Sequence, residues 1–152
     1  VRNLEDVRIF SVEPRISLGN IIDFNPRKSR RNMTVGYYDA MRMSYGLKGC
    51  IYYIDAPDDE RSYLERLAAR DPDGDLRRFM EVRLGQMAHE LKLPSDWTYQ
   101  DLYLAILEAA ARLLRLRKYK IYTLPELEAA IEDRKEDLMG LKKIPQFAGL
   151  FI

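Results

Sequence analysis

The chain has one cysteine, one histidine and none of the common catalytic signatures. Because Cys50 has no second cysteine to pair with, an intramolecular disulfide and a CxxC or zinc-ribbon site are excluded. His89 is the only base available to a Ser/His/Asp or Cys/His system, and no GxSxG sequence accompanies it. Walker A, GxGxxG and HExxH sequences are also missing. These absences predict a protein that is not an enzyme, with no catalytic residues, no metal site and no cofactor.

Long apolar runs and amide side chains are scarce as well. No apolar run approaches the ~20 residues that span a bilayer, and no secretion signal is visible at the N-terminus. Asparagine and glutamine total seven, whereas arginine and glutamate are abundant. This bias is typical of hyperthermophile proteins, and also of arginine-rich chains from GC-rich genomes. With 152 residues, 47% of them hydrophobic and 32% charged, the chain suits one domain with an appendage.

Positive charge is concentrated between residues 25 and 54. This stretch carries a net charge of +5, with Asp39 as its one acid, whereas the whole chain carries +1. It also holds half of the ten tyrosines. Because arginine forks onto phosphate oxygens and releases condensed counterions, the stretch predicts contact with a nucleic-acid backbone; the alternative is a basic loop before a helix with core tyrosines. The candidate nucleic-acid-binding residues are Arg27, Lys28, Arg30, Arg31, Tyr37, Tyr38, Arg42, Tyr45 and Lys48.

Residues 1–54 predict an extended N-terminal arm followed by a clamp of two helices. Pro14, Gly19 and the Asn25-Pro26 pair interrupt the apolar residues of the arm, which therefore forms either a hairpin on the domain or an extension onto a neighbouring subunit. Asn32 is the expected N-cap of the first clamp helix. A break at residues 46–49 then separates it from a second short helix that runs to residue 54.

Residues 55–140 predict an antiparallel four-helix bundle, so that the fold is all-α. Apolar residues recur at helical spacing over four segments joined by short loops, which favours antiparallel neighbours. Capping boxes at Thr98–Asp101 and Thr123–Glu126 begin the third and fourth helices. The apolar tail, residues 141–152, is expected to pack on the bundle or on a neighbouring subunit, with contact to a membrane as a weaker option.

A second basic run ends the third predicted helix. No acid occurs between residues 109 and 125. Cations at a helix C-terminus are favourable, but this run has five cations within nine residues, more than the helix dipole requires. The run therefore predicts contact with nucleic acid or with an acidic neighbour. Its residues are Arg112, Arg115, Arg117, Lys118 and Lys120.

A basic, aromatic, helix-broken arm before a four-helix bundle resembles the major capsid proteins of filamentous viruses of hyperthermophilic archaea. The resemblance is one of architecture along the whole chain and involves no signature motif. It implies a structural protein that polymerises around linear double-stranded DNA in A-form through sequence-independent phosphate contacts, by self-association or with a related second coat subunit. The product would be a helical virion assembled in the host cytoplasm. The alternative is a helical nucleic-acid-binding subunit of a non-viral complex, such as a CRISPR small subunit or a transcriptional regulator.

Overall fold

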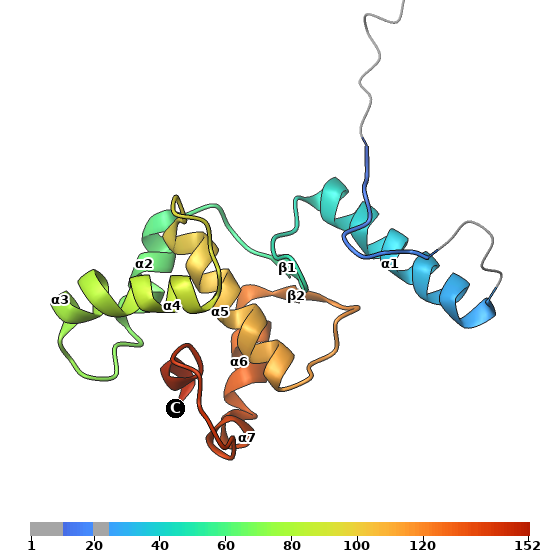
Figure 1. Cartoon of the computed structure of the whole chain (residues 1–152). Coiled ribbons are helices and arrows are strands. Elements are labelled where there is room, and N and C mark those ends of the chain that lie inside the picture. The colour runs from blue at the N-terminus through green and yellow to red at the C-terminus, as the bar shows by residue number, and fades with distance from the viewer. Residues whose placement is uncertain (1–10, 20–24) are drawn as a thin grey trace, which may run out of the picture. The chain divides into compact units, whose positions relative to one another are not determined.

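The computed structural model describes residues 11–19 and 25–152, and the chain forms two compact units, Val1–Leu47 and Lys48–Ile152 (Figure 1). Of the described residues, 56% are helical, and a small two-stranded sheet accompanies the helices. The division falls at residue 47, earlier than the expected boundary at residue 54. Those expectations for the arm that concern residues 1–10 and 20–24 lie outside the described residues.

The first unit contains one long helix, α1 (Pro26–Tyr45). The side-chain oxygen of Asn25 accepts hydrogen bonds from the backbone N–H groups of Arg27 (3.0 Å) and Lys28 (3.5 Å). Pro26 occupies the first turn, where a backbone N–H would have no acceptor within the helix. At the other end, Gly46 terminates the helix with a φ of 63°. The predicted start at Asn32 was therefore wrong, because Asn25-Pro26 is a helix start rather than a turn.

The described part of the arm, residues 11–19, has neither helix nor strand. It contacts α1 where the side-chain amide of Asn32 donates a 2.8 Å hydrogen bond to the carbonyl of Leu18. Val35 and Leu47 are buried within this part of the chain. Asn32 thus fastens the arm to α1 instead of capping it.

Helix α5 is the centre of the second unit, since eight of its fifteen residues are buried. It begins at the Thr98–Asp101 capping box and α6 begins at the Thr123–Glu126 box, which confirms both predicted starts. The helices that pack against one another here are α2 (Glu60–Ala68), α4 (Leu84–Glu90), α5 (Tyr99–Leu113) and α6 (Leu124–Glu132). The four expected helical segments are therefore present at about the expected places.

The antiparallel four-helix bundle itself is not confirmed. The carboxylate of Glu60, at the start of α2, accepts hydrogen bonds from the backbone N–H groups of Tyr99 (3.0 Å) and Gln100 (3.1 Å) at the start of α5. One turn further on, the rings of Tyr63 and Tyr103 lie 6.0 Å apart. The two helices therefore run in the same direction where they pack, and Glu60 satisfies N–H groups that would otherwise lack partners.

A parallel strand pair replaces the predicted second clamp helix. Strand β1 (Tyr53–Asp55) pairs with β2 (Ile121–Thr123), with Ile54 opposite Tyr122. Both segments are aromatic and β-branched, which suits strands, but a short apolar run does not reveal by its periodicity whether it is helix or strand. The all-α prediction was wrong at these two segments.

The remaining elements close the second unit. Asp75 caps a helical run by accepting from the N–H of Arg78 (3.1 Å). This run comprises α3 (Leu76–Arg78), the π-helical turn Phe79–Arg83 and α4. The C-terminal part contains α7 (Lys135–Met139) and the 3₁₀ turn Ala148–Phe151. The tail folds back onto its own chain: Phe151 is buried, and the guanidinium of Arg70 lies 4.5 Å from the centre of its ring.

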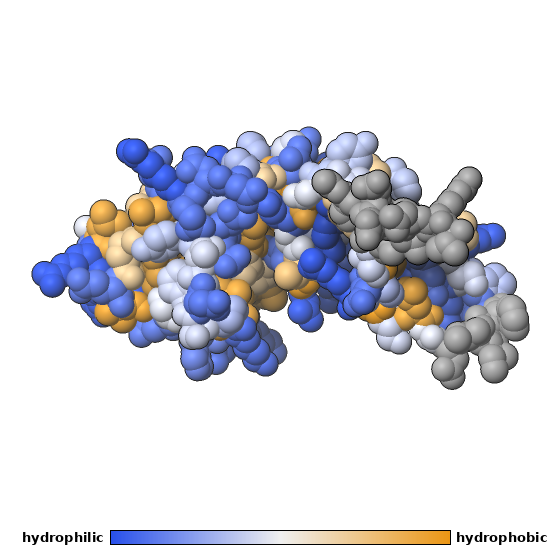
Figure 2. Space-filling view, turned by 90° about the horizontal axis from the view of Figure 1, so that it is seen from above, coloured by the Kyte–Doolittle hydropathy of each residue, from blue (hydrophilic) through white to orange (hydrophobic). Residues whose placement is uncertain are grey.

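The surface mixes apolar and hydrophilic areas, as the separate orange patches of Figure 2 show. Large apolar side chains with the greatest exposure include Met33, Tyr37 and Tyr45 of α1. Within the described residues, no helix combines the length and the apolar character that crossing a bilayer requires.

Candidate nucleic-acid interface

The start of α1 is a dense cationic surface. Arg27, Lys28, Arg30 and Arg31 lie within its first two turns, and all four are exposed. No acidic residue is present in the first turn, and the three arginines form no ion pair within the described part of the chain. Cations are unfavourable at the positive end of a helix dipole. A bound polyanion would relieve this unfavourable concentration of charge.

Aromatic and methionine side chains continue this surface along α1. Arg30, Met33 and Tyr37 follow one another at helical spacing and therefore share a side of the helix. Met33 is 75% exposed and Tyr37 is 59% exposed. Tyr37 stacks edge-on against the half-buried Tyr38, with ring centres 5.3 Å apart, whereas Tyr45 is exposed near the C-terminal end of the helix. Tyr37 and Tyr45 are thus accessible to a ligand.

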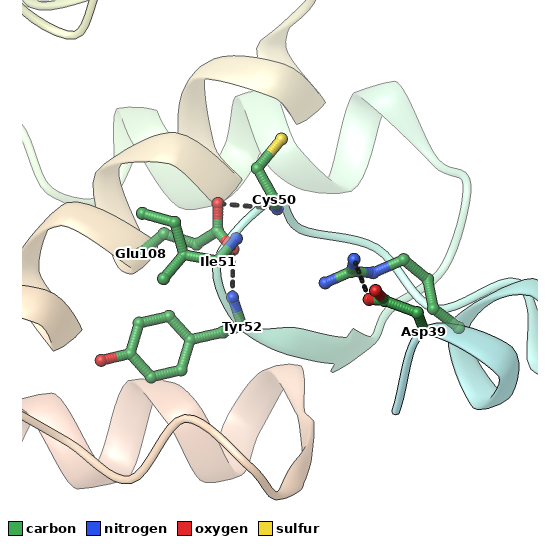
Figure 3. Close-up of polar contacts among 6 residues, drawn as sticks. Asp39, Cys50, Ile51, Tyr52 and Glu108 are labelled. Carbon is green, nitrogen blue, oxygen red and sulfur yellow. Dashed lines mark hydrogen bonds and ion pairs between the residues drawn. The ribbon is translucent and has the colours of Figure 1, made fainter. Parts of the chain in front are cut away.

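Two of the predicted contact residues are already engaged within the protein. Arg42 is buried in the first unit and forms a 3.3 Å ion pair with Asp39 (Figure 3). Lys48 lies in the second unit, where its Nζ is 2.6 Å from Oδ1 of Asp58. Hydrogen bonds from Lys48 and Gln100 lower the pKa of Asp58. Both cations were selected by charge alone, and their acidic partners make them poor candidates for phosphate contact.

The second basic run lies in the second unit. Helix α5 ends at Leu113, so Arg112 belongs to its last turn and the other four residues lie in the loop before β2. All five side chains are exposed, and none forms an ion pair with another described residue. The predicted continuation of the helix through this run was wrong, because the chain leaves the helix at Arg115 with a φ of 53°.

The structure also reveals a buried carboxylate that the sequence analysis missed. Glu108 of α5 accepts hydrogen bonds from the backbone N–H groups of Cys50 (3.0 Å), Ile51 (2.8 Å) and Tyr52 (2.7 Å) (Figure 3). Its exposed fraction is only 6%. The available signal was an acid on the apolar face of α5, at helical spacing from buried neighbours. Glu108 therefore fastens the segment before β1 to the central helix, and we call these contacts the Glu108 latch.

A groove of about 680 Å³ lies beside the Glu108 latch. Its walls include Leu91, Leu93 and Phe147, with Arg112 and Arg115 among the polar groups. His89 lies elsewhere, exposed on α4 in a shallow depression with Glu81 and Glu90. Among the described residues, no group of three or more His, Cys, Asp or Glu side chains is placed to hold a metal ion. His89 is thus a surface residue in the structure.

A partly buried polar cluster joins α2, α5 and α6. The hydroxyl of Tyr103 donates a 2.6 Å hydrogen bond to Glu128, which also accepts from Arg66 at 2.6 and 2.8 Å. Burial, and then this hydrogen bond, raise the pKa of Tyr103 to about 12. Burial also raises the pKa of Tyr52 to about 12, and its hydroxyl donates to the carbonyl of Leu116.

Stability is therefore expected to fall in alkaline solution. The folded chain holds the Tyr103 proton more tightly than the unfolded chain, so its contribution is complete below pH 10 and is lost as the pH rises from 10 through 12. The loss should reach about 2 to 3 kcal/mol for Tyr103. Urea unfolding between pH 8 and 12 measures it. Tyr103→Phe should be less stable than the native chain at pH 8 but should lose less on alkalinisation; parallel losses would contradict this assignment.

Comparison of the chain with protein-family models, curated protein sequences and solved structures yields no match. Function has therefore to be inferred from the charge, exposure and hydrogen bonding of the chain's own residues. Those properties single out two exposed cationic surfaces, one at the start of α1 and one in the loop after α5.

Proposed function

We propose that the chain is a structural protein that binds double-stranded DNA without sequence preference, through the cationic start of α1, and polymerises along it. The observation that carries the proposal is the set of four exposed cations in the first two turns of α1, with no acid in the first turn. Phosphate contacts position a protein on a duplex but read no bases, which suits a coat that must accept any sequence.

The position of these cations on a helix strengthens the proposal. Residues 27–31 would sample many conformations in a loop, whereas the Asn25 cap and Pro26 fix them at the start of a helix. Arginine side chains projecting from a fixed backbone lose less entropy when they bind phosphate. The contact surface comprises Arg27, Lys28, Arg30 and Arg31, with the exposed ring of Tyr37 two turns after Arg30 on the same side of the helix.

Self-association is supported by the exposed apolar residues of the same helix. Met33, Tyr37 and Tyr45 expose 75%, 59% and 68% of their surfaces, and apolar side chains gathered in this way are typical of contact surfaces. In the proposed assembly α1 contacts both DNA and neighbouring subunits. The architecture would then correspond to the capsid proteins that the sequence resembles, with virion localisation and an A-form duplex as further proposals.

Neutralising the start of α1 tests the DNA-binding proposal. The fourfold variant Arg27→Gln, Lys28→Gln, Arg30→Gln and Arg31→Gln should bind a random-sequence duplex at least tenfold more weakly at 0.15 M salt, as ~4 phosphate contacts are lost. The slope of log affinity against log salt concentration should decrease by about 3 to 4. Fluorescence anisotropy across a salt series measures both. The stability of the variant should stay within about 1 kcal/mol of the native chain, since the residues are exposed.

A charge-matched control separates a site from a general effect of net charge. Arg77→Gln, Arg78→Gln, Lys142→Gln and Lys143→Gln remove the same charge from exposed positions elsewhere. This control should retain most of the affinity. Equal losses in the two variants would remove α1 from the DNA site. Electron microscopy of the DNA complex then tests polymerisation: filaments are expected, and a discrete complex would favour the non-viral subunit.

A further inference from the structure

We propose that the second unit carries its own nucleic-acid backbone site, formed by Arg112, Arg115, Arg117, Lys118 and Lys120, here called the body patch. The inference shares the class of ligand, a nucleic-acid backbone, with the proposed function. It concerns a different surface, because the body patch belongs to a different unit from α1. Each unit would then hold phosphate groups independently. The proposed ligand is the sugar-phosphate backbone of a duplex.

The body patch differs in its charge environment from the other cations of the second unit. Seven cations elsewhere in this unit form ion pairs with acids, and those without an ion pair in the described chain are not gathered in one short stretch that lacks acids. The paired residues are Lys48, Arg61, Arg66, Arg77, Arg83, Arg134 and Lys135. In the body patch, by contrast, five exposed cations fall within nine residues, and none pairs with an acid of the described chain. An external anion would therefore reduce the mutual repulsion of these cations.

Hydrogen bonds from inside the unit hold the loop that displays these cations. The carbonyl of Leu114 accepts from the guanidinium of Arg134 at 2.6 Å. The carbonyl of Leu116 accepts from the hydroxyl of Tyr52 at 3.2 Å, and that of Arg117 accepts from the hydroxyl of Tyr122 at 2.8 Å. Three carbonyls of one short loop are thus fixed by side chains from other elements. The body patch is therefore preorganised, which lowers the entropy that binding costs.

Side-chain directions in the loop separate the apolar residues from the cations. Leu114 is buried and Leu116 is half-buried, whereas Arg115 between them is exposed. The ammonium of Lys120 lies 4.7 Å from the centre of the Tyr122 ring, which holds this exposed cation near the loop. The loop thus anchors itself with leucines and directs its charges to solvent.

Arg115 occupies a backbone conformation that favours glycine. Its φ of 53° follows the last turn of α5, at the position where helices commonly end with a left-handed glycine. A side chain there is strained relative to glycine. Lys92 has the same conformation, with a φ of 57°, after α4. The chain therefore offers two strained cations at equivalent helix ends, one inside the body patch and one outside it.

The composition of the body patch favours a nucleic-acid backbone over an acidic protein. The cores of protein interfaces are rich in aromatic and apolar side chains and poor in lysine. Between residues 109 and 125, Leu113, at 40% exposed, is the sole large apolar side chain that the structure shows as exposed. Arg112 and Arg115 border the groove beside the Glu108 latch, whereas Arg117, Lys118 and Lys120 are not among its lining residues. Arginines and lysines distributed in this way along a loop match regularly spaced phosphates.

The test uses the full chain carrying Arg115→Gln, Arg117→Gln, Lys118→Gln and Lys120→Gln. Affinity for a random-sequence duplex should fall at least tenfold at 0.15 M salt, and the salt slope should decrease by about 3. The control is the charge-matched variant of Arg77, Arg78, Lys142 and Lys143. If the body-patch variant and this control bind DNA equally well, the inference is overturned, and an acidic protein becomes the better partner for the body patch.

Two single variants test whether weaker DNA binding comes from lost charge or from misfolding. Arg115→Gly should unfold at an equal or higher urea concentration, because glycine relieves the left-handed strain, yet it should bind DNA several-fold more weakly. Lys92→Gly relieves the same strain and removes the same charge, and its DNA affinity should remain close to native. Equal DNA affinities in these two variants would also overturn the inference. DNA binding by the α1 variant is measured separately, so a result that contradicts the proposed function can be distinguished from one that contradicts the body patch.

Discussion

Glu108→Ala is expected to lower the free energy of unfolding by about 3 to 5 kcal/mol. The substitution removes the shared acceptor of three backbone N–H groups, those of Cys50, Ile51 and Tyr52. Tyr52 is fully buried, so water cannot readily replace the carboxylate there. An N–H group left buried without a partner costs about 1 to 3 kcal/mol.

Glu108→Gln should give a smaller loss. Oε1 accepts from Ile51 and Tyr52, and Oε2 accepts from Cys50. A glutamine with its oxygen at the Oε1 position keeps two bonds and places an NH₂ group against the N–H of Cys50. Its cost should be about half that of the alanine variant. Urea unfolding measures the series, with Glu90→Ala on the exposed side of α4 as the control; equal stabilities for Glu108→Ala and Glu90→Ala would contradict the Glu108 latch.

Gly49→Ala is the second change with a large expected effect, a loss of about 3 kcal/mol or more. Gly49 has a φ of 89°, a backbone conformation that residues other than glycine rarely adopt. An added Cβ would lie 2.6 Å from Oε1 of Glu108 and 2.7 Å from the carbonyl oxygen of Tyr52. Neither atom can easily move, because three hydrogen bonds hold the carboxylate and the carbonyl belongs to the backbone. The Glu108 latch therefore requires glycine beside it.

Gly74→Ala separates backbone strain from the close approach. Gly74 also has a positive φ, 68°, but an added Cβ there would meet no atom within 4 Å. It should cost only about 1 kcal/mol, the ordinary penalty of a left-handed alanine. The difference between the two unfolding free energies measures the contact at Gly49. If Gly49→Ala were no more destabilising than Gly74→Ala, the packing of the Glu108 latch would be looser than its distances indicate.

Local sequence determined where most helices lie and where charge is concentrated along the chain. The capping boxes at Thr98 and Thr123 place the starts of α5 and α6, because an N-cap and its partner are only three residues apart. The charges of Arg27, Arg30 and Arg31 were visible as a cluster in the same way. Such signals depend on neighbours within one or two helical turns, so a single sequence contains them in full.

The tertiary structure alone decided which groups meet across the chain. Only folding brings Glu108 to the backbone of residues 50–52, pairs Ile54 with Tyr122, and gives Lys48 an acidic partner in Asp58. Each of these contacts joins residues that are far apart in sequence or lie in a segment whose local pattern fits helix and strand equally well. Composition and periodicity describe one segment at a time, whereas hydrogen-bond and ion-pair partners are fixed by packing between segments. For that reason the sequence showed how many cations the chain carries, and the structure showed which of them remain exposed.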